Sequence, residues 1–282
     1  MTSRQERRQR LAKLAKVTER IERSGLSAAP ELVELAAMAA IVDDGLEATG
    51  GVKRAVARIA AIQDKSNAAA PFHGEVACRK GCAFCCSLSV SASAPQVFAV
   101  ADHLRASAPD LAAEIARIAA ADARTRGLDT YGRFLNKAFC AFLVDGACSV
   151  YSARPSVCRG ALSRSAEVCE RLFRGERTDD ANIDEATVFR TACDEAVWAV
   201  LHRHGLRLAG YELAHAVLVA LAEPDAEARW RRGEDVFAAV RAEALANVSP
   251  RDEAFWGALW AVAHGETIAP GPYAARFPDW CR

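Results

Sequence analysis

The chain has 282 residues, of which 51% are hydrophobic, so it can bury the core of one domain or of two closely packed ones. Its 36 acidic and 36 basic residues give a formal charge of zero, so the overall charge does not indicate a nucleic-acid-binding protein. The N-terminus lacks the apolar run of a signal peptide, and no window offers about 18 uninterrupted apolar residues. We therefore expect a cytoplasmic protein with no membrane-spanning helix.

Residues 1–70 are predicted to form an N-terminal helical segment. Residues 1–23 carry eight basic and three acidic side chains, with apolar residues at helical spacing from Leu11 to Ile21. We interpret this stretch as an amphipathic surface helix; a basic arm for nucleic acid or for an acidic partner is the alternative. Two further helices are predicted, from Pro30 to near Gly45 and after Gly50–Gly51.

Residues 71–175 hold two clusters of cysteines, and this segment is predicted to be a metal-binding domain. The first cluster places four thiols within nine residues, at Cys78, Cys82, Cys85 and Cys86. In a reducing cytoplasm, clustered thiols are more often metal ligands than disulfides, which are the alternative. His73, five residues before Cys78, is interpreted as a surface residue, with a ligand role as the alternative.

The C-x3-C-x2-C spacing of Cys78, Cys82 and Cys85 is the one with which radical S-adenosylmethionine enzymes hold a 4Fe–4S cluster. Those enzymes need alternating strands and helices, which this sequence lacks, so that architecture is not expected. Because side chains of adjacent residues usually point apart, Cys86 is predicted to bind a second centre or another corner of the same cluster.

The second cluster follows two predicted helices, one starting at Ser93-Ala-Pro95-Gln96 and one at Pro109-Asp110. Short strand-like runs around Asp145-Gly146 predict a hairpin that brings Cys140 and Cys148 to matched positions. Cys158 and Cys169 come next. Arg154 and Arg159 flank Cys158, where a cation lowers a thiol pKa and offsets the charge of a bound cluster, so both are predicted to support the bound group.

The compound pattern over residues 75–170 resembles the YkgJ-type cysteine-cluster family, whose CxxCxxCC domain is described as zinc- or iron-chelating. It combines C-x3-C-x2-C-C with Cys-x-Phe-Leu and Cys-x-Val-Tyr-x-x-Arg-Pro-x-x-Cys-Arg. Family members often carry a glutamate after the first cluster, where this chain has Pro95-Gln96. The resemblance implies that seven cysteines are ligands, with Arg154, Pro155 and Arg159 as supporting residues: Cys78, Cys82, Cys85, Cys86, Cys140, Cys148 and Cys158. Cys169 lies outside the matched pattern and is a candidate eighth ligand.

Flagellin lysine methylases contain a similar domain, which implies methyl transfer to protein lysine as an alternative activity. The resemblance covers only the cysteine region, however, and a fold element does not carry an activity with it. No G-x-G-x-x-G turn follows a strand in this chain. Whether the protein is an enzyme is left open.

Residues 176–282 are predicted to be a C-terminal helical segment packed on the same core. A helix capped by Asn182 or Asp184 runs to Gly205, with Cys193 on its apolar face as a buried thiol and His202 and His204 at its end. Another helix contains His215. Cys281 is predicted to be a free thiol.

Together these patterns predict a mainly α protein: a helical bundle-like body with a small β-hairpin insert that closes a cysteine-rich metal site. Zinc takes four ligands and would leave about half of the thiols unused, so iron in a 4Fe–4S cluster is preferred and zinc is the alternative. The expected role is structural, storage or redox, with an unknown protein as partner or substrate.

Overall fold

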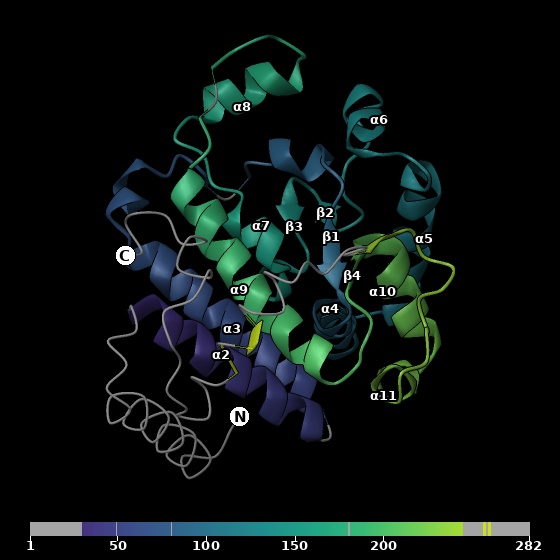
Figure 1. The fold of residues 1–282 in the computed structure, drawn as a ribbon. Helices are drawn as coiled ribbons and strands as arrows, with labels where there is room; N and C mark the ends of the chain where they lie inside the picture. Colours follow the sequence, from purple (N-terminus) through teal and green to yellow (C-terminus); the bar gives the residue numbers. More distant parts are fainter. Residues whose placement is uncertain are drawn as a thin grey trace.

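The fold was obtained as a computed structural model, which describes residues 30–48, 50–79, 81–179, 181–244, 256–257 and 259–260. The predicted basic helix of residues 1–23 and Cys281 lie outside these residues. Figure 1 shows a mainly helical molecule in which only short strands interrupt the helices, as the sequence predicted. No helix in the described part of the chain is long and apolar enough to cross a membrane.

The N-terminal helices α2 (Pro30–Glu47) and α3 (Gly51–Ala69) pack closely against each other and against α9 (Asp184–Arg203). Glycines allow this approach: a Cβ atom on Gly51 would lie 2.4 Å from the carbonyl oxygen of Gly45. Gly50 adopts a left-handed conformation with φ of 61°, which turns the chain between the helices. The first helix begins at Pro30 as predicted and extends slightly beyond Gly45.

Three helices pack together beside this pair: α4 (Ala94–Ser107), α5 (Leu111–Thr125) and α10 (Leu213–Ala222). The helix starts predicted from the sequence are present: the Gln96 side chain accepts a 3.2 Å hydrogen bond from the Ser93 amide, and the Asp110 side chain accepts one from the Ala113 amide. For α9, by contrast, neither predicted cap is correct, since the N-cap residue is Ile183.

A short antiparallel sheet has the strand order β1 (Ser91–Ser93), β4 (Ala209–Glu212) and β5 (Ala242–Ala244), which the sequence analysis did not predict. Beside it, the buried Arg133 of α6 (Thr130–Leu135) forms a 2.5 Å ion pair with Glu212. The second oxygen of Glu212 accepts a hydrogen bond from the His215 amide at the start of α10. These contacts hold α6 to the body of the protein.

The predicted hairpin is present as β2 (Leu143–Val144) and β3 (Ala147–Cys148). Asp145 and Gly146 both have positive φ, of 49° and 74°, which a tight two-residue turn requires. In Figure 1 the hairpin and α7 (Ser156–Gly160) lie below two outer helices, α6 and α8 (Ala166–Phe173). A short helix, α11 (Ala226–Arg231), follows α10.

A continuous hydrophobic core joins residues from all three predicted segments, from Leu35 of α2 through Val97 of α4 to Leu259. The segment boundaries themselves stay a prediction. Three one-turn helices, η1 (Pro71–Glu75), η2 (Phe84–Ser87) and η3 (Tyr151–Ala153), connect the larger elements around the cysteines.

Candidate metal centre

The first cysteine cluster lies on the turn that ends in η2. Gly81 has a left-handed φ of 90° between Cys78 and Cys82, and η2 then carries Cys85 and Cys86. The Cys86 carbonyl accepts a 2.7 Å hydrogen bond from the Cys140 amide. The backbone therefore links the first cluster directly to the start of the second.

The second cluster is arranged differently from its prediction. Cys148 ends β3 and is paired in register with Leu143, whereas Cys140 lies before the first residue of β2. The two cysteines are therefore not cross-strand partners, because each strand of the hairpin is only two residues long. They are still close enough for the charge of Cys148 to raise the pKa of Cys140.

Cys158 lies on α7, and polar side chains that are buried or half-buried, from three other helices, hold this one-turn helix. Gln63 of α3 donates a 3.2 Å hydrogen bond to the Ser156 carbonyl, and Asn67 donates one of the same length to the Arg159 carbonyl. The Ser156 hydroxyl accepts a 2.8 Å hydrogen bond from Gln96 and donates a 2.5 Å one to Asp194 of α9. Sequence reasoning missed these supports, because each joins residues that are distant along the chain.

The two arginines predicted to support the bound group have different surroundings. The buried Arg159 pairs with Asp64 and donates hydrogen bonds to the carbonyls of Ser152 and Arg154, at 2.6 and 2.9 Å. It therefore braces the turn before α7. Arg154 is the one whose charge lowers the pKa values of Cys85, Cys148 and Cys158.

The electrostatics of the thiols divide them into two overlapping groups. Burial and, to a smaller extent, the charges of Cys140, Cys148 and Cys85 together raise the pKa of Cys158 to about 12. Burial also raises the pKa of Cys78, and the neighbouring charges there come from Cys82, Cys85 and Cys169. Cys85 belongs to both groups.

Cys85 and Cys86 form a hydrogen-bonded pair of thiols. The Cys86 thiol donates to Cys85, which lowers the pKa of Cys85 and raises the pKa of Cys86. Arg154 also lowers the pKa of Cys85, so Cys85 is the thiolate of the pair. A bound cation would favour the deprotonated form of every thiol that it contacts.

None of the nine described cysteines forms a disulfide, but within the described residues no three side chains of His, Cys, Asp or Glu are placed to hold one metal ion. The donor set is soft and rich in sulfur, which fits zinc or iron by its chemistry. The thiols gather around one region without completing a coordination shell. His73 lies on η1 and is exposed, and Cys193 is fully buried in α9, as predicted.

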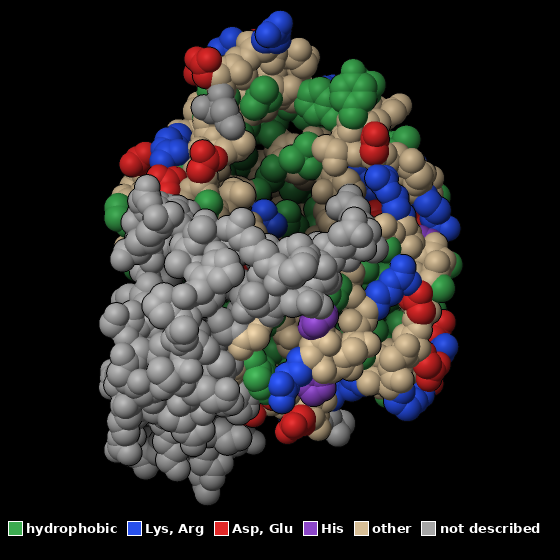
Figure 2. Space-filling model, in the orientation of Figure 1, with side chains coloured by type: hydrophobic (Ala, Val, Ile, Leu, Met, Phe, Trp, Pro, Cys, Tyr) green, Lys and Arg blue, Asp and Glu red, His purple; other side chains and the backbone are tan. Residues whose placement is uncertain are grey.

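Aromatic residues surround the first cluster. The Phe173 ring of α8 lies 5.9 Å from the Phe84 ring of η2 and 5.5 Å from that of Phe139, between centroids. Tyr131 and Tyr151, which precede Cys140 and follow Cys148 in the sequence, are exposed. Figure 2 shows the surface hollowed between α8 and α6, with a lining that is largely of the hydrophobic class, which includes cysteine. Neither α6 nor α8 was anticipated from the sequence.

Residues 77–194 match the family model CxxCxxCC, described as "Putative zinc- or iron-chelating domain". The match extends past Cys169 to Asp194, beyond the limit set from the sequence pattern. No curated protein and no solved structure matches the chain. The similarity to flagellin lysine methylases therefore stays an expectation. Residues 77–194 are therefore similar to the CxxCxxCC family of cysteine-cluster domains, which is described as zinc- or iron-chelating.

Proposed function

We propose that this protein binds iron through its clustered cysteines, as a 4Fe–4S cluster, with a structural, storage or redox role. The observation that carries the proposal is the number of thiols in one region of a chelating domain. Cys85 interacts electrostatically with Cys78 on one side and with Cys158 on the other. A single zinc ion takes four ligands, so it would leave part of this set unused.

The residues around the thiols also support the proposal. The charge of Arg154 offsets thiolate charge, and the fixed position of α7 presents Cys158 to the other cysteines. The cysteines that would hold the group are Cys78, Cys82, Cys85, Cys86, Cys140, Cys148, Cys158 and Cys169. When bound, such a cluster supplies one-electron redox chemistry or a rigid cross-link between these segments.

Purification without oxygen, followed by iron, zinc and sulfide analysis and an absorption spectrum, tests the proposal. We expect about four irons and four sulfides per chain and a broad absorption band near 400 nm. A colourless protein with one or two zinc ions and no sulfide would overturn the iron–sulfur assignment and leave a zinc-binding module.

Two cysteine variants provide the matched comparison. Cys158→Ala removes a thiol of the second cysteine cluster, whereas Cys193→Ala removes a thiol of α9 that is buried in the hydrophobic core of the protein. We expect the first to lose most of the bound metal and the second to keep the metal content per folded chain. Circular dichroism would confirm that both variants are folded.

A further inference from the structure

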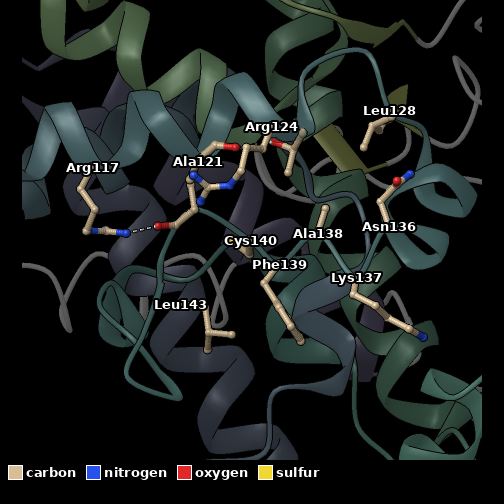
Figure 3. Close-up of a pocket in the computed structure, with 12 residues that line it drawn as sticks. Arg117, Ala121, Arg124, Leu128, Asn136, Lys137, Ala138, Phe139, Cys140 and Leu143 are labelled. Carbon is tan, nitrogen blue, oxygen red and sulfur yellow. Dashed lines mark hydrogen bonds between the residues drawn. The ribbon is translucent and has the colours of Figure 1, made fainter.

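A cavity of about 530 Å³ lies between α5 and the segment that leads into the hairpin (Figure 3). Its walls include Ala121 and Arg124 from α5 and, on the other side, Phe139, Cys140 and Leu143. This volume is typical of sites for small organic molecules. Because Cys140 forms part of the wall, a molecule in the cavity would lie beside the candidate metal centre.

The charged side chains that line the cavity are all cationic: Arg117, Arg124 and Lys137. Two of them are already engaged. Arg117 forms an ion pair with Glu114 and donates a hydrogen bond to the Ala141 carbonyl, drawn as a dashed line in Figure 3. The Lys137 ammonium lies 4.1 Å from the centre of the Phe173 ring and donates to the Phe173 carbonyl.

Arg124 is the cation that remains available to a ligand. Its side chain donates one hydrogen bond, of 3.1 Å, to the Ala120 carbonyl of its own helix. Among the residues described in the structure, no carboxylate pairs with it. A guanidinium has five N–H donors in a planar fork that matches a carboxylate, so most of its donors are free for an anion.

The rest of the lining is largely apolar, from Ala121, Leu128, Phe139 and Leu143. An arginine at one position with apolar walls elsewhere suits a ligand that has an anionic group on a short carbon chain. We propose that this cavity binds a small organic acid, whose carboxylate pairs with Arg124 while its carbon chain contacts the apolar part of the lining. The proposal does not depend on the bound metal.

Calorimetric titration of the full chain with glutarate tests the proposal, and glutaramide serves as a probe of similar shape without charge. We expect glutarate to bind at one site per chain. Glutaramide should bind the wild-type protein at least about tenfold more weakly than glutarate does, and the Arg124→Gln variant should bind glutarate at least about tenfold more weakly than wild type does. Arg177→Gln, which changes an exposed arginine outside the cavity lining, should leave the affinity for glutarate within about twofold.

The proposal is overturned if glutarate gives no binding heat at millimolar concentration. It is also overturned if glutaramide binds equally well or if Arg124→Gln leaves the affinity unchanged in a variant with normal circular dichroism. The titration is run on metal-free and on metal-loaded protein. Binding to the metal-free chain would support the cavity even if the metal analysis disproved an iron–sulfur cluster.

Discussion

The side-chain amide of Gln63 donates a hydrogen bond of 3.2 Å to the backbone carbonyl of Ser156, 93 residues further along the chain. Gln63 belongs to α3, which lies before the residues that match the family model, whereas Ser156 begins the helix that carries Cys158. The support of the candidate metal centre therefore extends beyond the domain that the family describes.

Gln63→Ala should destabilise the protein by about 1–3 kcal/mol, because it leaves the Ser156 carbonyl without this donor in a buried site. Urea denaturation measures the change. Lys65→Ala, an exposed substitution on the same helix, should alter the free energy of unfolding by less than about 0.5 kcal/mol. Equal effects of the two substitutions would show that the hydrogen bond has no particular importance.

Gly160→Ala should destabilise the packing of α7 on α9. A Cβ atom at Gly160 would lie 2.6 Å from Cβ of Arg190 and 3.1 Å from the Ala186 carbonyl oxygen, so a neighbouring element must shift. We expect a loss of about 1–3 kcal/mol and a lower metal content, since Cys158 lies on the displaced helix. Gly74→Ala is the control, because no atom lies within 4 Å of its added Cβ. A stable, fully loaded Gly160→Ala protein would contradict this packing.

Asp194 should make the stability depend on pH in a direction unusual for a carboxylate. Burial raises its pKa above the ordinary 3.8, although hydrogen bonding to Ser156 and the charge of Arg190 act against this shift. Since the folded state holds the proton more tightly than the unfolded state does, the stabilisation is present at low pH. It is lost as pH rises from about 3.8 through the folded pKa.

Comparing wild type with Asp194→Asn by urea denaturation across this range isolates the effect, because acid effects common to both cancel. The stability of wild type relative to Asp194→Asn should fall as pH rises. Glu185, on the same helix, should affect the pH dependence of stability in the opposite direction. Its own backbone amide and then Arg164 lower its pKa, so its contribution to the stability of the folded state is lost as pH falls. A stability difference independent of pH in Asp194→Asn would disprove the raised pKa.

Cys85 should matter more for metal binding than Cys169. The charge of Cys85 acts on Cys78, Cys148 and Cys158, whereas that of Cys169 acts on Cys78. Competition with a chelator measures the affinity for the metal. Loss of a residue that only supports a ligand typically weakens metal binding by roughly 10–100-fold, so we expect Cys85→Ala to weaken it by at least this factor and Cys169→Ala to weaken it less. Equal losses of metal affinity in the two variants would contradict this prediction and would show that both thiols contribute equally to metal binding.

Sequence patterns anticipated the features that depend on neighbouring residues. Asp145-Gly146 fixed the hairpin because a two-residue turn needs positive φ at both positions. Helix starts were found at Ser93-Ala-Pro95-Gln96 and at Asp110, where the side chains of Gln96 and Asp110 accept hydrogen bonds from backbone amides at the start of each helix. The clustered cysteines likewise identified the chelating domain, since the residue types alone define a soft donor set.

The tertiary structure alone decided which distant residues support those thiols. The pairing of β1 with β4, the contact of Gln63 with Ser156 and that of Ser156 with Asp194 each join segments that no local pattern relates. The sequence placed Arg154 and Arg159 on either side of Cys158. Packing then directed Arg159 to Asp64 and left Arg154 to act on the thiols, because only the folded chain determines which partner each guanidinium meets.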